Sequence, residues 1–272
     1  NEKHNAPCET CSACREAQAT SHPDILFITP EKDKATIGVE PIRGAITEAL
    51  IKPFYNRHKV FILDDGDILT PQAQNALLKI IEEPPEYAIF IIVCTNSEIL
   101  LETVRSRAVT VTFSPLPDSI VREYIENKYP DEPRVEFLVK YCAGIPKSAD
   151  LIISDNDFDT MREEVLNLIP RLLSKNKAYA YDVAEYIENN KDRANEIYDM
   201  MLLYLRDAVI YAMGKNDNVI NTDKLDKISL LGSKYEPQLL AKAIDEIMVA
   251  KKMLERNVKT SATALHAGLS IK

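Results

Sequence analysis

The alternation of apolar and polar positions predicts strands and helices in turn over the first 114 residues. Strands are predicted over residues 24–28, 60–63, 88–94 and 109–113. Residues 60–63 form the continuous apolar run that is typical of a strand buried on both faces of a parallel sheet. Because strand and helix alternate, we expect an α/β domain whose parallel sheet carries helices on both faces.

The clearest helix of this region follows the second strand. Thr70 is placed to cap it, and Pro71 occupies its first position, where the missing N–H has no role in the helix. Pro84 and Pro85 end it. Its apolar face, at helical spacing, consists of Ala73, Ala76, Leu77, Ile80 and Ile81. Two further helices are expected, one from Pro41 to Leu50 and one that carries Leu100, Leu101 and Val104.

Beyond residue 114 the pattern is helical throughout. Helices are predicted over residues 119–128, 135–142, 161–173, 178–189, 193–213 and 237–256, with a last one from Ser261. A helix–helix turn is expected at residues 144–147. We therefore divide the chain into an α/β domain (1–114), a small helical lid (115–157) and a C-terminal helical bundle (158–272). The predicted fold class is α/β plus all-α.

The composition limits the class of protein. With 46% apolar residues, a chain of 272 residues can bury more than one core. No apolar run approaches the roughly 20 residues that span a bilayer, and the first residues lack the basic-then-apolar pattern of a signal peptide. A cytoplasmic location without membrane contact is expected. The net charge of −9 argues against strong nucleic-acid binding by the chain as a whole, although it leaves room for local basic patches.

Three cysteines, Cys8, Cys11 and Cys14, form a C-x-x-C-x-x-C cluster. Thiolates at this spacing suit one tetrahedral metal, so we predict structural zinc, with His4 or His22 as a candidate fourth ligand. The alternative is three reduced thiols in a frayed N-terminus. The remaining cysteines are expected to be ordinary core residues: Cys94 and Cys142.

Acidic and polar residues follow two neighbouring strands. Asp64 and Asp65 end one strand, and Thr95 with Asn96 follow the next. Side chains of this kind at the carboxyl ends of parallel strands are the usual layout of a nucleotide site. The 272 residues contain no G-x-x-x-x-G-K-[ST] loop that would bind phosphates. The sequence therefore holds the second half of an ATPase site without the first half.

The most specific motif lies in the helix that follows Thr70. Its residues Gln74–Lys79, which run into Glu82–Pro85, resemble the helix that is typical of clamp-loader AAA+ subunits. The cysteine cluster followed by His22-Pro23-Asp24 distinguishes such subunits from other AAA+ proteins. The other matching motifs are Arg57-His58-Lys59, Val104–Arg107 and Leu254–Val258. Together these motifs extend over nearly the whole chain, and they resemble the delta-prime subunits of the bacterial DNA polymerase III clamp loader.

The resemblance implies an incomplete AAA+ domain of the P-loop type, a helical lid and a C-terminal collar for oligomerisation. In that family a fourth cysteine usually precedes the other three, and the phosphate loop, where one exists, also lies upstream. Here both positions fall before Asn1, so the chain is expected to begin after the first strand and helix of the AAA+ domain. Structural zinc is the implied cofactor, whereas ATP and Mg²⁺ are not expected to bind this chain.

The same resemblance assigns roles to the strand-end residues. Asp64 and Asp65 match the acidic pair that holds Mg²⁺ in an active ATPase, although the second acid there is usually glutamate. Their alternative role is that of strand-end caps and turn formers. Thr95 and Asn96 match the sensor that reads the γ-phosphate, with a polar turn as the alternative. Lys147 stands where an active subunit often has arginine, and lysine cannot form the bidentate fork that suits phosphate.

Arg107 is the residue that the resemblance assigns to catalysis. In clamp loaders a Ser-Arg-Cys motif places its arginine against the nucleotide of the neighbouring subunit. Here Ser106-Arg107-Ala108 keeps the arginine without the cysteine. An arginine supplied in trans is worth about 10³–10⁵ in rate in GTPases. The alternative role of Arg107 is a structural ion pair, and the adjacent Arg105 is not expected to act in trans.

The resemblance therefore implies a clamp-loader subunit that helps to load the sliding clamp onto primer–template DNA without hydrolysing ATP itself. Its expected partners are the delta and gamma/tau subunits and, through them, the clamp, the DNA and the DNA-directed DNA polymerase holoenzyme. No intrinsic catalysis is expected of the chain. Two other functions stay open. One is an active AAA+ ATPase, such as the motor subunit of the clamp loader, whose phosphate loop lies upstream. The other is a zinc-dependent interaction module unrelated to replication.

Overall fold

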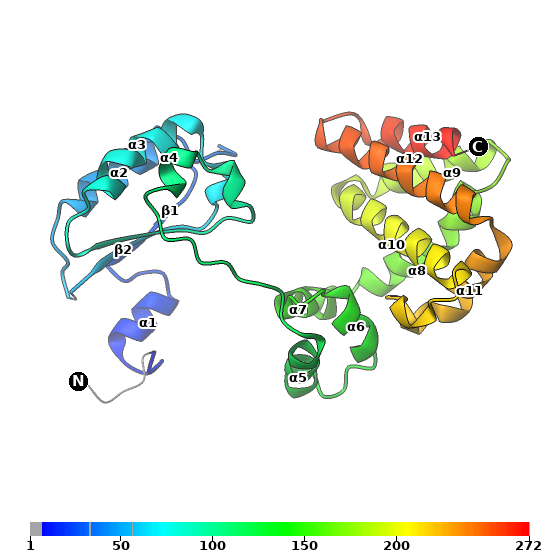
Figure 1. Cartoon of the computed structure of the whole chain (residues 1–272), viewed down its shortest axis with the longest axis horizontal. Coiled ribbons are helices and arrows are strands. Elements are labelled where there is room, and N and C mark those ends of the chain that lie inside the picture. The colour runs from blue at the N-terminus through cyan, green and yellow to red at the C-terminus, as the bar shows by residue number, and fades with distance from the viewer. Residues whose placement is uncertain (1–6, 33, 56, 272) are drawn as a thin grey trace. The chain divides into compact units, whose positions relative to one another are not determined.

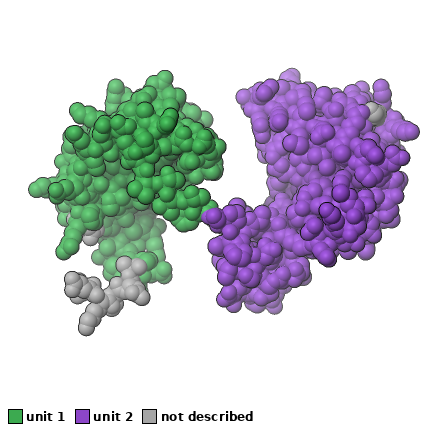
Figure 2. All heavy atoms as spheres, viewed as in Figure 1, with its two compact units in different colours: residues 1–113 green, residues 114–272 purple. Residues whose placement is uncertain are grey.

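The computed structural model describes residues 7–32, 34–55 and 57–271. Two compact units make up the chain, residues 1–113 and 114–272, drawn in green and purple in Figure 2. The first unit is α/β and the second is all-α, so the predicted fold class is confirmed. Among the described residues, no helix is long and apolar enough to cross a membrane.

A three-stranded parallel sheet in the order β1-β2-β3 forms the centre of the first unit. Its strands are β1 (Ile25–Ile28), β2 (Lys59–Leu63) and β3 (Ala88–Ile92). The three strands predicted at these places are confirmed to within two residues at each end. Since all three run in the same direction, their carboxyl ends meet at one edge of the sheet.

Helices cover one face of this sheet (Figure 1). α2 (Val39–Ala49) and α3 (Pro71–Glu82) share a core with Phe61 and Leu63 of β2, both fully buried. The hydroxyl of Thr70 accepts the N–H of Ala73 at 3.2 Å and caps α3, as predicted.

The start of α2 differs from the prediction. The helix begins at Val39 instead of Pro41, which stands at its third position. Proline is tolerated there because the N–H groups of the first turn have no acceptor within the helix.

The other face of the sheet is bare within the described part of the chain. Two cross-strand rows of apolar side chains line it: Ile25, Val60 and Ile89 in one, Phe27, Ile62 and Ile91 in the other. Phe27 is 41% exposed and Ile91 43% exposed. The expectation of helices on both faces is therefore wrong for the described residues. Strands in the simple order β1-β2-β3, joined by right-handed crossovers, place both connecting helices on the same side.

Residues 109–113, predicted as a strand, form none among the described residues. Val109 is 93% exposed and Phe113 92% exposed. Alternating threonine and apolar residues favour a strand, but a strand also needs a neighbour for its backbone N–H and C=O groups. The helix expected around Leu100 is also shorter, because η2 (Ser97–Ile99) precedes a single turn, α4 (Glu102–Arg105). Two short elements of this unit were not predicted: α1 (Ser12–Gln18) and η1 (Gly66–Ile68).

The second unit is an assembly of helices around one continuous apolar core. The helices that had been predicted are confirmed to within three residues at their ends: α5 (Asp118–Lys128), α6 (Val135–Tyr141), α8 (Phe158–Leu172), α9 (Ala178–Asn189), α10 (Ala194–Ala212), α12 (Pro237–Glu255) and α13 (Thr260–Ser270). Two more complete it: α7 (Pro146–Ser154) and α11 (Leu225–Lys234). The core includes residues on both sides of residue 157, and the division into a lid and a bundle stays a prediction.

A buried arginine joins two of these helices. Arg162 of α8 is 1% exposed, and its guanidinium lies 3.6 Å from the ring centre of Phe137 in α6. The same guanidinium donates to both carboxylate oxygens of Asp223 at 3.0 Å and to Asn221 Oδ1 at 2.9 Å. Because the Arg162 charge is removed from water, the energetic cost of burying it must be offset by these partners.

Candidate functional site

The carboxyl ends of β2 and β3 carry the predicted nucleotide-site residues, and a further aspartate links them. The carboxylate of Asp67 accepts the N–H of Thr95 at 2.8 Å and the N–H of Asn96 at 3.4 Å. The bond from the Thr95 N–H is the main cause that lowers the pKa of Asp67. Asp67 is not among the predicted site residues, although aspartates after a strand often bind nearby backbone N–H groups.

Gly66 allows the close approach of these two strand ends. Its N–H donates to the carbonyl oxygen of Val93 at 2.7 Å. A Cβ atom at this position would lie 2.7 Å from Ile92 Cγ2 and 3.0 Å from the Val93 carbonyl oxygen. Glycine is therefore required sterically at the first position of η1.

Asp64 and Asp65 are exposed at this edge, and the structure assigns their carboxylates no hydrogen bond to a described residue. Asp65 precedes η1 without capping it through its side chain. Asp64 lines an open hollow of about 610 Å³ together with Phe27 and Thr29 of the β1 edge. Both carboxylates are thus accessible to a cation, but the loop that would hold phosphates is absent from the 272 residues.

The remaining predicted nucleotide-site residues are Thr95 with Asn96, which follow β3, and Lys147, which lies in the second unit. Asn96 Oδ1 accepts the N–H of Glu98 at 2.9 Å and caps η2, which is the behaviour of a polar turn residue. Thr95 is exposed beside it. Lys147 belongs to the second unit, at the second position of α7, with an exposed side chain. The structure therefore brings together Asp64, Asp65, Thr95 and Asn96 at one edge of the sheet.

Arg107 follows α4 and is held by weak surface contacts. Its Nη1 donates to the Thr103 carbonyl oxygen at 3.0 Å, and its Nη2 to Glu82 Oε1 at 3.2 Å. The side chains of Arg107 and Glu82 are 34% and 57% exposed. Since an exposed ion pair is worth about 0–1 kcal/mol, the guanidinium can exchange Glu82 for another anion readily. The adjacent Arg105 instead pairs with Glu98 at 2.7 Å.

The cysteine cluster is assembled at the start of α1. The Sγ atoms of Cys8, Cys11 and Cys14 all lie within 4.8 Å of one another. Cys11 is the N-cap residue, and its sulfur accepts the Cys14 N–H at 3.4 Å. The backbone N–H of Cys11 is the main cause that lowers the pKa of Cys8 to about 6. Because the thiolate is the metal-binding form, this chemistry fits a metal ion.

Among the described residues, the cluster of possible metal ligands consists of the three cysteines. His4 lies outside the described residues. His22 is buried, and its Nδ1 accepts the N–H of Asp24 at 3.1 Å, so this atom already serves the backbone. Of the two remaining cysteines, Cys142 lies in the core at 3% exposure as predicted, whereas Cys94 is half-buried.

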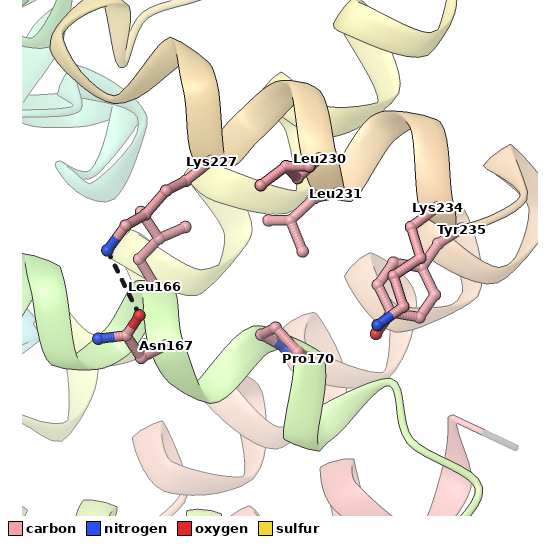
Figure 3. Close-up of a pocket in the computed structure, with 8 residues that line it drawn as sticks. All are labelled: Leu166, Asn167, Pro170, Lys227, Leu230, Leu231, Lys234 and Tyr235. Carbon is pink, nitrogen blue, oxygen red and sulfur yellow. Dashed lines mark hydrogen bonds between the residues drawn. The ribbon is translucent and has the colours of Figure 1, made fainter.

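An apolar pocket of about 410 Å³ lies in the second unit between α8 and α11 (Figure 3). Leu166 and Leu231 line it, and the Lys227 ammonium donates to Asn167 Oδ1 at 3.4 Å at one end. Pro170 also lines it and has no N–H to donate to the carbonyl oxygen of Leu166. The ionisable residues of its lining are Lys227, Lys234 and Tyr235, with no acid, histidine or cysteine among them.

Comparison with known proteins assigns the family. Family models described as "DNA polymerase III, delta subunit" and "DNA polymerase III, delta subunit, C terminal" match residues 1–117 and 156–261. DNA polymerase III subunit delta' of Bacillus subtilis is 26% identical over 98% of this chain and 81% of its own length. This chain belongs to the DNA polymerase III delta-prime family. The predicted family resemblance is thereby confirmed.

Other relatives, delta-prime and gamma/tau, are matched over smaller parts of their length. Subunit delta' of Yersinia pestis is 28% identical over 82% of this chain and 66% of its own length. The Escherichia coli subunit delta' is 34% identical over 52% of this chain and 43% of its own length. Subunit gamma/tau of Mycobacterium bovis is 36% identical over 43% of this chain and 20% of its own length. The chain is thus a clamp-loader subunit of the delta-prime and gamma/tau group.

Solved structures resemble the delta-prime-family chain more distantly. A DNA polymerase III gamma subunit-related protein from Thermotoga maritima has a TM-score of 0.44 and 19% identity, covering 94% of this chain and 89% of its own. The Bacillus subtilis DNA clamp loader delta protein has a TM-score of 0.34 and 13% identity, covering 93% and 87%. These TM-scores are too low to establish an architecture.

Proposed function

We propose that this delta-prime-family chain helps to load the sliding clamp onto primer–template DNA as part of a complex with delta and gamma/tau subunits. It lends Arg107 to the nucleotide of a neighbouring subunit and does not hydrolyse ATP itself. The observation that carries this proposal is the setting of the Arg107 guanidinium. It is partly exposed after α4, and its described partners are a surface glutamate and a backbone carbonyl oxygen.

The chemistry of a trans-acting arginine suits this setting. A guanidinium offers parallel N–H donors that match two phosphate oxygens, and its charge persists at every relevant pH. As negative charge develops on the transferred phosphoryl group, a positioned guanidinium stabilises the transition state. Glu82 would occupy the guanidinium until a neighbour's phosphate replaces it.

Two observations favour a second function, that of an ATP-hydrolysing motor subunit. The gamma/tau match reaches 36% identity, and the carboxylates of Asp64 and Asp65 are accessible. That match extends over only 43% of the chain, however, and the Asn96 side chain is engaged in capping η2. ATP turnover by the purified subunit separates the two functions, because steady hydrolysis supports the motor.

We expect the 272-residue chain to bind no ATP measurably, with or without Mg²⁺. Without backbone N–H groups to cradle the phosphates, Asp64 and Asp65 repel them. Isothermal calorimetry with Mg-ATP checks this directly. Micromolar binding that disappears in an Asp64→Asn, Asp65→Asn double variant would show that the strand-end acids form a working site.

We also propose that Cys8, Cys11 and Cys14 bind a structural zinc ion. Three converging sulfurs, one with a lowered pKa, support the assignment. Zinc bound there would link the N-terminal turn to α1 and stabilise both, because metal binding to a preformed site adds to folding stability.

Cobalt titration tests the metal site, since Co²⁺ occupies tetrahedral thiolate sites and gives them visible absorption. We expect one ion per chain with a sulfur-to-cobalt charge-transfer band, displaced by zinc. Cys11→Ser should weaken binding strongly, whereas Cys94→Ser, outside the cluster, should leave it unchanged. Equal cobalt binding by the two variants would exclude the cluster as the site.

A further inference from the structure

The apolar pocket between α8 and α11 continues onto an exposed part of α11. Leu231 of its lining is 5% exposed, whereas its neighbour Leu230 is 69% exposed. Pro170 of α8 lies on the opposite side of the pocket and is exposed as well (Figure 3). Apolar surface that extends from a pocket onto its rim is typical of a site that binds another molecule. We call the pocket and this rim the α11 groove.

The side of the groove that α11 provides has a regular pattern. Its residues stand at positions i, i+3, i+4 and i+7 of the helix, and they therefore form one stripe along it: Lys227, Leu230, Leu231 and Lys234. At a rise of 1.5 Å per residue, the two lysines are about 10 Å apart along the helix axis. Figure 3 shows them at opposite ends of the groove. The groove thus has an apolar centre with a cation at each end.

The cations of the α11 groove are not fully neutralised. Lys234 forms no ion pair with a described residue, and its ammonium lies 5.3 Å from the ring centre of Tyr235. Lys227 pairs with Glu163, but the same carboxylate also binds the Lys224 ammonium at 3.0 Å. Two ammonium groups therefore share one carboxylate at that end of the groove. The groove is positive although the net charge of the chain is −9.

We propose that the α11 groove binds an amphipathic helix of a partner protein, one with acidic residues seven positions apart and apolar residues at the third and fourth positions between them. The apolar side chains cover Leu230 and enter the pocket, while the carboxylates pair with Lys227 and Lys234. Because every α-helix has the same rise per residue, this spacing matches that of α11 in either direction. Apolar anchors at i, i+3, i+4 and i+7 are the usual means by which a helix binds in a groove.

A second copy of this chain is the competing occupant, and its sequence lacks a suitable helix. Two acids seven positions apart that enclose apolar residues at the third and fourth positions occur once, at Asp24, Phe27, Ile28 and Glu31. Phe27 and Ile28 belong to strand β1, where successive side chains point to opposite faces. The occupant is therefore a different protein. The proposal goes beyond the clamp-loading role and does not depend on Arg107, so either can fail without the other.

Fluorescence anisotropy of the full chain with a fluorescein-labelled synthetic peptide tests the pattern. The probe is an alanine-rich peptide of about 20 residues, long enough to form a helix, with glutamates and leucines at the proposed spacing. A second peptide has the same composition in a shuffled order, so that its leucines are spread around the helix. We expect the patterned peptide to bind about tenfold more tightly than the shuffled one, because only the patterned peptide can place its apolar anchors in the groove together.

Substitutions in the groove test its apolar and charged parts separately. Leu230→Ala should weaken binding of the patterned peptide by about fivefold to thirtyfold, the usual effect of truncating an anchor residue. Leu151→Ala in α7, where the side chain is 64% exposed, is the matched control and should bind like the wild type. Lys234→Glu should weaken binding of the glutamate peptide and favour a peptide with lysines at the same positions. Lys191→Glu, at an exposed site in η3, should change neither affinity.

Three results with the folded wild-type chain or its variants would overturn the proposal. These are equal binding of the patterned and shuffled peptides, unchanged affinity of Leu230→Ala, and equal binding of the glutamate and lysine peptides by the wild type. A dimer in sedimentation equilibrium that Leu230→Ala dissociates would assign the groove to a second copy of the chain instead. Circular dichroism of each variant verifies folding, which the exposure of Leu230 and Lys234 leads us to expect.

Discussion

Replacing Arg107 with alanine should lower ATP-driven clamp loading by the reconstituted complex by about a thousandfold or more, the effect of removing a trans-acting arginine in GTPases. The reason is that no other donor reproduces the charge and fork geometry of a guanidinium at the phosphoryl group. Folding should be unaffected, since the substitution removes one exposed ion pair worth about 0–1 kcal/mol. Single-turnover loading of a fluorescent clamp measures the loading rate, and a thermal melt of each variant measures its stability.

Glu82→Ala is the most informative control for this effect. If Arg107 served structure alone, removing its partner at 3.2 Å should produce the same defect as removing the arginine. A trans-acting role predicts normal loading by Glu82→Ala and a severe defect in Arg107→Ala. Arg107→Lys should rescue little because one ammonium lacks the planar fork, and Arg105→Ala should load normally. Full activity of a stable Arg107→Ala complex would leave the chain as a scaffold.

The helices were predictable from the sequence because their signals are local. The spacing of apolar residues along α9 and α12 fixed those helices to within one residue at each end, and Thr70 and Pro71 located the start of α3. Each signal lies within the segment that it describes, so no knowledge of distant neighbours was needed.

The predictions that failed depend on whether another segment of the chain packs against the one in question. Residues 109–113 have the alternation of a strand but no partner strand among the described residues. The face that carries Phe27 and Ile91 has apolar side chains but no helix over it in the described part of the unit. Apolar periodicity shows which side chains favour burial, and it does not show whether anything covers them.

The candidate site was predictable to a similar extent. Parallel strands implied that Asp64 and Thr95 lie at one edge of the sheet, and they do. The roles of Asp67 and Asp24 could not be read from the sequence, because each binds backbone N–H groups 28 to 31 residues away. Bonds over such separations depend on how the loops meet in the folded state.

Arg162→Ala should destabilise the second unit by about 3–5 kcal/mol, the usual effect of breaking a buried ion pair from one side. The substitution leaves the Asp223 carboxylate, 25% exposed, without its bidentate partner, and removes the guanidinium from above the Phe137 ring. Urea unfolding followed by circular dichroism gives the change in the free energy of unfolding. A surface control is available in Arg122, which pairs with Glu136 at 2.6 and 2.8 Å yet should contribute under about 1 kcal/mol.

The same experiment addresses whether residues 115–157 behave as a separate lid. Arg162 of α8 contacts Phe137 of α6 across the predicted boundary, and Phe137 shares one apolar core with Val165 of α8. We therefore expect tyrosine fluorescence and circular dichroism to report a single coincident transition for this unit, in the wild type and in Arg162→Ala. Separate transitions in the variant alone would mean that this arginine is what couples the two parts. A loss below about 1 kcal/mol, with one transition retained, would show instead that apolar packing suffices and that the buried charge is dispensable.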